Sequence, residues 1–317
     1  MVPSCTLSAA KLQNTGMSIT ISADRTTSLP KRHDNNDYTI ALQSMIPQRS
    51  AIQAISQGTP LPPVPNHTDM DKQRRWMLEH LAGAFRVFAR KGYAEGMSGH
   101  ISLRDPEHPD LFWTNPLGMH FGLIAVSDFI LLDHNGEVAG GNTTRPANAA
   151  GFLIHSGLHK RYPHVNAACH THSPNGKAWS TFATPLDMIN QDVTMFYGKA
   201  LGVYREFGGV VLDAAESERL ADALGPEGKG LILRNHGLLT VGQTVDEAAY
   251  LFTLLEKSCE IQLKVDAAAA LGTKKMIIEP EAAEYTFRMT SDPEALYYEF
   301  QPDYDFETKM SAGDFLL

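Results

Sequence analysis

The pattern that most constrains the fold is the alternation of helical and strand-like segments between residues 71 and 272. Apolar residues recur at helical spacing in the first segment, as Met77, Leu81 and Phe88 show. Several short strand-like runs follow, and then helices and strands alternate. This order predicts an α/β fold in which helices cover the faces of a mixed sheet.

Local signals divide this region into elements. Two helix starts carry capping patterns, Asp213 with Glu216 and Thr244 with Glu247, and Gly225 stands where the first of these helices should end. Strands are predicted for the segments "GHISLRD", "LFWTNP", "DFILLD", "VNAACHTHS" and "GGVVLD", and for both halves of "GLILRNHGLLTVG".

The chain changes character near residue 68. Segments such as "TPLPPVPNH" and "LPKRHDNND" lack a periodic apolar pattern and are rich in proline and polar residues. We therefore expect an extended or disordered arm over residues 1–67 and one domain over 68–275. Residues 276–317 are expected to form a tail that packs on the domain or on a neighbouring subunit.

Composition excludes several classes of protein. The chain has 317 residues, 43% of them hydrophobic, and a net charge of -9, which argues against nucleic acid or an anionic membrane as the partner. No apolar run reaches the roughly 18–20 residues that span a bilayer. Cys5, Cys169 and Cys259 are odd in number and widely spaced, so a disulfide framework is not expected. We expect a cytoplasmic protein that acts on a small molecule.

The stretch "NAACHTHSP" places two histidines at the end of a predicted strand. His170 and His172 are two residues apart, so their side chains share one face and could converge on one ion. His236, in a turn between two strand-like segments, is the best third ligand, and three protein ligands leave the open position of a catalytic zinc site. The alternative is that both histidines cap the strand and bond to the backbone.

Two further features near this strand have simpler interpretations. His155 and His159 are four residues apart on a predicted helix, a spacing that can bind metal, but no third ligand accompanies them. We expect a satisfied pair on the helix face. Cys169 faces away from His170 and is expected to be a small buried residue.

The segment "CHTHS", followed by "LILRNHGLLTVG", resembles the paired signature of the class II aldolase/adducin family. "GHISLRD", "FWTNPLGMHF" and "DEAAYLFTLLEKSCEIQL" resemble it too, in the family's order. The resemblance implies an α/β/α layered domain with a central mixed, mostly antiparallel sheet, commonly assembled as a homotetramer with sites between subunits. It also implies that His170, His172 and His236 bind a divalent ion, usually Zn²⁺.

The sequence departs from the family's sugar-phosphate aldolases at their functional residues. Those enzymes carry an acid/base glutamate one helix before the histidine pair, and an ungapped alignment places Gly151 there. Their two phosphate-binding serines become Ala149 and Ala150, and their Gly-Asn-x-Ser loop reads "GHIS", with His100 and Ser102. A phosphate dianion requires several strong donors, so these changes argue against a phosphorylated sugar. The pattern is similar to the adducin-like branch.

Asp192, in "MINQDVTMFYG", is the candidate replacement for the missing acid. It lies near the position of the family's catalytic tyrosine, and a carboxylate there could move protons or orient a metal-bound imidazole. His100, Ser102 and Asn115 are the candidate substrate-binding residues, from the "GHIS" and "FWTNP" segments of the resemblance.

Three classes of function remain open. The first is a metal-dependent lyase, acting by an aldol or retro-aldol step or by decarboxylation, on a non-phosphorylated hydroxy-keto or carboxylic compound. The second is an oxygenase of the non-haem type with Fe²⁺. The third is a non-catalytic, adducin-like interaction module. Zinc favours the lyase, iron with O₂ uptake favours the oxygenase, and a metal-free oligomer favours the module.

Overall fold

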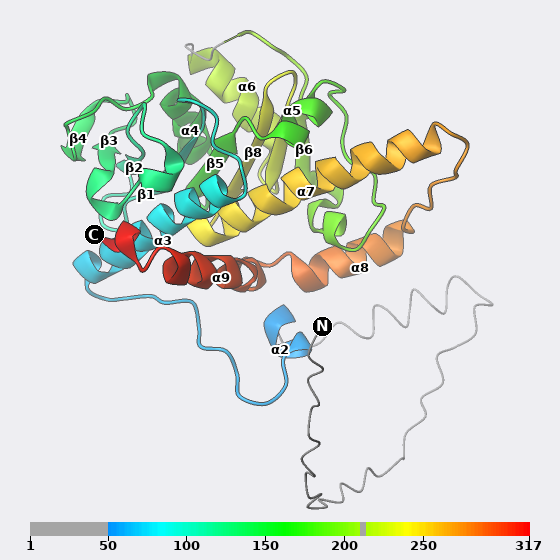
Figure 1. Ribbon diagram of the computed structural model, residues 1–317, viewed down its shortest axis with the longest axis horizontal. Helices are drawn as coiled ribbons and strands as arrows, with labels where there is room; N and C mark the ends of the chain where they lie inside the picture. Colours follow the sequence, from blue (N-terminus) through cyan, green and yellow to red (C-terminus); the bar gives the residue numbers. More distant parts are fainter. Residues whose placement is uncertain (1–49, 210–213) are drawn as a thin grey trace, which may run out of the picture.

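The computed structural model describes residues 50–209 and 214–317, and within them the chain forms one sheet flanked by helices (Figure 1). The strand order is β4-β3-β2-β1-β5-β8-β7-β6, and all neighbours pair antiparallel except β6 and β7. The predicted α/β/α architecture with a mixed, mostly antiparallel sheet is therefore confirmed. The strands are β1 (His100–Arg104), β2 (Phe112–Thr114), β3 (Ile130–Leu132), β4 (Val138–Gly141), β5 (Ala167–Thr171), β6 (Leu201–Tyr204), β7 (Gly230–Leu233) and β8 (Gly237–Gly242).

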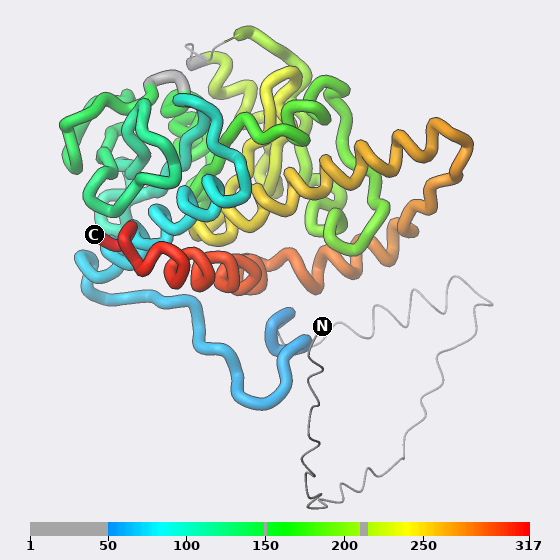
Figure 2. The backbone as a smooth tube through the Cα atoms, viewed as in Figure 1, coloured from blue at the N-terminus to red at the C-terminus, as the bar shows by residue number. Residues whose placement is uncertain are grey.

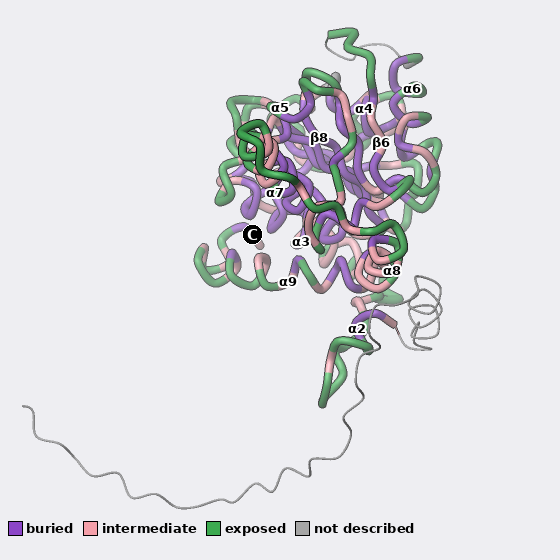
Figure 3. The backbone as a smooth tube through the Cα atoms, turned by 90° about the vertical axis from the view of Figure 1, so that its right-hand side faces the viewer, coloured by how far each residue is buried: buried purple, intermediate pink, exposed green. Residues whose placement is uncertain are grey.

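Helices cover both faces of the sheet, and Figure 3 shows buried segments running between them. The helices α4 and α6 pack on one face, and α3, α5 and α7 pack on the other. The described helices are α2 (Ala51–Ile55), α3 (Met70–Arg90), α4 (Ala149–Arg161), α5 (Pro174–Ser180), α6 (Ala214–Leu224), α7 (Val245–Ala269), α8 (Pro280–Thr290) and α9 (Pro293–Met310). Short 3-10 turns are η1 (Phe121–Leu123), η2 (Val126–Asp128), η3 (Asp192–Phe196), η4 (Gly198–Ala200) and η5 (Asp314–Leu316).

The central strand β5 divides its side chains between the two cores, as the period of a strand requires. Ala168 packs with the α4/α6 core, whereas Ala167 and Cys169 pack with the α3/α7 core. Cys169 is fully buried, as expected. His170 therefore faces the α4/α6 side.

The C-terminal helices lie against the same domain. Helix α9 packs along α3 and α7, burying Leu296 and Phe300, and α8 contacts η3. In Figure 2 the chain ends beside α3, where the backbone N–H of Ser127 donates to the carbonyl of Leu317 at 3.0 Å. At the other end, Ala51 and Ile52 of α2 pack on α9 next to Ala295.

The structure contains a strand, β6, for which no strand was predicted from the sequence. The "GGVVLD" strand was predicted after it, but Gly208 and Gly209 belong to no strand, and 210–213 lie outside the described residues. Much of the predicted arm, 1–49, and the Asp213 cap lie outside them as well. The Thr244 cap is confirmed, because its hydroxyl oxygen accepts from the backbone N–H of Glu247 at 3.1 Å. No helix in the described ranges is long and apolar enough to cross a bilayer.

Candidate metal and substrate site

The sheet topology brings the predicted histidines to one edge. Strand β5 runs antiparallel to both β1 and β8, so its end meets their starts. His100 begins β1 directly opposite His170 of β5, and therefore on the same face. His172 follows β5, and His236 immediately precedes β8.

The donor atoms of His170, His172 and His236 converge. One ring nitrogen from each lies within 4.8 Å of those of the others, and the Nε2 atoms of His172 and His236 are 3.0 Å apart. The turn before β8 aims His236: Asn235 adopts φ +55° and Gly237 φ +155°. Glycine is needed there because a Cβ on Gly237 would lie 3.1 Å from the Thr171 carbonyl oxygen. We call these three residues the histidine triad.

Hydrogen bonding and burial leave the triad in the form that binds metal. The Nδ1–H of buried His170 donates to the carbonyl of Leu238 at 2.7 Å, so Nε2 carries the lone pair. Burial lowers the pKa of all three imidazoles, and with the nearby His172 it lowers the pKa of His236 to about 4. Neutral imidazoles with converging ring nitrogens fit a divalent cation of the zinc type.

Glu95 lies next to the triad and is not among the site residues predicted from the sequence. Its Oε2 is 4.0 Å from Nδ1 of His172 and accepts from Nζ of Lys177 at 2.7 Å. The hydrogen bond from Lys177 lowers the pKa of Glu95, so the carboxylate is ionised beside the ligand histidine. The only sequence signal was its place in "YAEGMSGH", just ahead of the "GHIS" segment.

The predicted residues His100 and Ser102 belong to a second group on the same face, which we call the histidine–serine chain. Nδ1 of His100 lies 3.0 Å from Nε2 of His155, and Nδ1 of His155 lies 2.7 Å from Oγ of Ser102. Oγ of Ser102 lies 2.7 Å from Nε2 of His159, whose Nδ1 donates to the Val165 carbonyl at 3.0 Å. The expected satisfied pair on the helix face, His155 and His159, is therefore confirmed.

Gly151 lies against the ring of His100. A Cβ built on Gly151 would lie 2.2 Å from Cδ2 and 2.6 Å from Nε2 of His100, far inside van der Waals contact. The position aligned with the family's glutamate thus has no room for any side chain while His100 keeps its place.

The other two predicted residues lie in different surroundings. Asn115 is buried directly after β2, which pairs antiparallel with β1, so it belongs to the same sheet edge as His100. Asp192 is exposed at the start of η3, near α7 and α8. Burial and the charge of Glu299 raise the pKa of Tyr250 most, and the charge of Asp192 raises it further. No contact with the triad is found for Asp192 in the described part of the chain, and its catalytic role stays a prediction.

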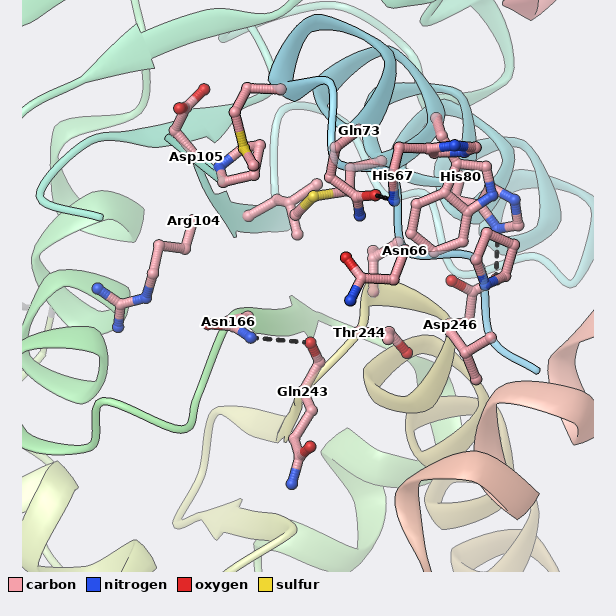
Figure 4. Close-up of a pocket in the computed structure, with 18 of the residues that line it drawn as sticks. Asn66, His67, Gln73, His80, Arg104, Asp105, Asn166, Gln243, Thr244 and Asp246 are labelled. Carbon is pink, nitrogen blue, oxygen red and sulfur yellow. Dashed lines mark hydrogen bonds and ion pairs between the residues drawn. The ribbon is translucent and has the colours of Figure 1, made fainter. Parts of the chain in front are cut away.

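A pocket of about 330 Å³ opens at the opposite edge of the sheet (Figure 4). Arg104 at the end of β1, Asn166 before β5 and Gln243 after β8 contribute to its wall. Asn166 Nδ2 donates to the Gln243 carbonyl at 3.0 Å. Nδ1 of His80 lies 2.6 Å from Oδ1 of Asp246. The pocket contains no member of the triad or of the histidine–serine chain, so it is separate from the candidate site.

The fold and the placement of the triad agree with a sequence match to the Class II Aldolase and Adducin N-terminal domain over residues 79–263. The chain belongs to this family. The Schizosaccharomyces pombe "Meiotically up-regulated gene 14 protein" is 41% identical over 79% of this chain and 96% of its own length.

Two bacterial relatives have names that describe chemistry. "Decarboxylase NovR" of Streptomyces niveus is 40% identical over 62% of this chain and 72% of its own. The "4-hydroxy-3-prenylphenylpyruvate oxygenase/4-hydroxy-3-prenylbenzoate synthase" of Streptomyces roseochromogenus is 39% identical over 62% and 70%. Among solved structures, "L-fuculose 1-phosphate aldolase from Glaciozyma antarctica PI12" superposes with a TM-score of 0.73 and 37% identity, covering 80% of this chain and 96% of that one.

Proposed function

We propose that this protein is a divalent-metal-dependent lyase that cleaves a carbon–carbon bond in a non-phosphorylated hydroxy-keto or carboxylic compound. The observation that carries the proposal is the convergence of three neutral imidazole donors at one sheet edge. The same proposal includes Zn²⁺ as the ion, a homotetramer as the assembly and the cytoplasm as the location.

In this proposal His170, His172 and His236 hold the ion, and Glu95 orients His172. When bound, the ion would supply Lewis acidity at a substrate carbonyl, the chemistry that retro-aldol cleavage and decarboxylation both need. The histidine–serine chain lines the substrate side, with His100 directly opposite His170.

The chain's own residues favour a substrate without phosphate. Gly151 supplies no acid, and the ring of His100 fills the space beside it. The decarboxylase name of one relative supports carboxylic substrates, whereas the solved aldolase is named for a sugar phosphate. We favour the carboxylic class because the residues that argue against phosphate belong to this chain itself.

The test is a metal analysis of the purified protein followed by an assay of the zinc-loaded enzyme. We expect pyruvate from a 4-hydroxy-2-oxo acid, or CO₂ from a 3-oxo acid, and a slower or absent reaction with L-fuculose 1-phosphate. A variant with His170→Ala and His172→Ala controls for catalysis by free metal. Turnover of the sugar phosphate alone would contradict the proposed substrate class.

A second candidate function is supported by the name of one relative, which includes an oxygenase activity on an arylpyruvate. Three protein ligands with open positions suit non-haem Fe²⁺. O₂ uptake by the iron-loaded protein with 4-hydroxyphenylpyruvate, absent from the zinc-loaded protein, would establish this candidate in place of the lyase. A protein that is an intact oligomer but binds neither ion would instead favour the interaction module.

A further inference from the structure

The histidine–serine chain has a fixed end, and that end determines the position of every hydrogen along it. The Val165 carbonyl can only accept, so Nδ1 of His159 must carry a hydrogen. Burial and the nearby Arg104 keep His159 neutral by lowering its pKa to about 3. Its Nε2 is therefore an acceptor.

The remaining bonds follow one after another. The single hydroxyl hydrogen of Ser102 points to Nε2 of His159, so the Ser102 oxygen must accept from Nδ1–H of His155. Burial lowers the pKa of His155, which leaves its Nε2 as an acceptor for Nδ1–H of His100. His100 is then left with a lone pair on Nε2.

That lone pair is the end of the chain that faces the candidate site. Nε2 of His100 has no hydrogen-bond partner among the residues that the structure describes, and it lies against the backbone of Gly151, which has no side chain to donate to it. The His100 and His170 rings lie with their centroids 5.0 Å apart, so the His100 ring lies beside the triad.

We propose that His100 selects the substrate at this site by accepting a hydrogen bond from a substrate hydroxyl, and that Ser102, His155 and His159 are positioning residues that hold it in this tautomer. This inference rests on the proposed function. A phosphate group, which at neutral pH has little hydrogen to donate, meets a lone pair when placed against His100 and is disfavoured. The backbone carbonyl of Val165 fixes the tautomer of His159, and the hydrogen bonds through Ser102 and His155 then fix the tautomer of His100.

The first test reads the tautomers by long-range ¹H–¹⁵N NMR of the protein without metal. We expect Nδ1–H for His100, His155 and His159. Ser102→Ala should give a mixture at His100 and His155, because the bridging oxygen is gone, and Ser102→Thr should restore the single tautomer. Nε2–H at His100 in the unaltered protein would overturn the proposal.

The second test uses a matched pair of probes, glycolate and methoxyacetate, which differ in having O–H or O–CH₃. We expect the zinc-loaded protein to bind glycolate more tightly, by up to about tenfold for one hydrogen bond beyond what the ion itself distinguishes. The preference should shrink at least about threefold in Ser102→Ala and persist in Ser102→Thr. An unchanged preference in Ser102→Ala would overturn the proposal.

Metal content separates this inference from the function on which it rests. His100→Asn should keep its zinc, and loss of zinc in that variant would make His100 a ligand and overturn the selecting role. If the unaltered protein binds no divalent ion, the proposed function fails, whereas the tautomers can still be read by NMR. The His164→Asn variant, at an exposed histidine, controls for general effects on the spectra.

Discussion

Two groups of histidines lie on the same face of the sheet and differ in how their nitrogens are used. In the histidine–serine chain every nitrogen except Nε2 of His100 has a partner within the protein. In the triad His170 uses Nδ1 in the interior, and one ring nitrogen from each of the three histidines lies within 4.8 Å of those of the others. Clustered imidazoles therefore indicate a metal site where one nitrogen of each ring converges on a common point, and not where the nitrogens are used along a hydrogen-bonded chain.

The largest effect is expected from removing two members of the triad. Replacing both His170 and His172 with alanine should remove the bound divalent ion, from about one per chain to none, because one imidazole does not hold zinc at a catalytic site. Metal analysis after dialysis measures this. His164→Ala should retain the ion, and full occupancy in the double variant would show that the ion is bound elsewhere.

The next largest effect is expected from interrupting the histidine–serine chain at Ser102. Ser102→Ala leaves Nδ1–H of His155 and Nε2 of His159 buried without a partner, and we expect the free energy of unfolding to fall by about 2–4 kcal/mol. Urea denaturation measures it. Ser156→Ala is the matched control, because its hydroxyl donates a single bond to the His134 carbonyl at 2.9 Å. Equal losses in the two variants would show that the bridging role of Ser102 is not structural.

A smaller effect concerns the contact between His100 and Gly151 of α4. Gly151→Ala should lower the free energy of unfolding by about 1–3 kcal/mol, since its Cβ would meet the His100 ring. Helix propensity alone predicts the opposite sign. The loss should shrink when His100→Asn is already present, which a double-mutant cycle measures.

Gly140→Ala serves as the control for Gly151→Ala, because its Cβ would make only ordinary contacts with Leu131, the nearest at 3.7 Å. The same geometry means that Gly151→Glu alone cannot restore the family's acid without displacing His100. Weak aldolase activity is therefore expected only when both positions are changed. Additive losses in the cycle would contradict the steric link.

Local signals in the sequence predicted the parts of the triad, and the family resemblance joined His236 to the other two. The period of a strand places His170 and His172 on one face, and the glycine after His236 marks a turn. It also predicted that Cys169 points away and that His155 and His159 lie on one helix face. These inferences require no knowledge of strand register.

The relations that the sequence did not predict depend on register or on a loop. Ser102 bridges two helical histidines only because β1 packs beside α4, and Glu95 reaches His172 from the loop before β1. The steric exclusion between Gly151 and His100 likewise needs the packing distance. Strand β6 was not predicted because a four-residue parallel strand carries little periodic signal.

The smallest expected effect is a pH dependence from the histidine–serine chain. His159 has a folded-state pKa of about 3, well below the value near 6.5 of an unfolded chain, so the unfolded state takes up the proton first. Stability is therefore lost as pH falls below 6.5, by about 1 kcal/mol between pH 6.5 and 5.5 for one such histidine. Urea denaturation at the two pH values measures the slope.

His159→Gln should show a shallower slope than the unaltered protein, although its stability at pH 7 is lower, whereas the exposed control His164→Asn should keep the original slope. If His159→Gln loses as much stability on acidification as the unaltered protein, His159 is already protonated in the folded state, and the tautomer order of the whole chain changes with it.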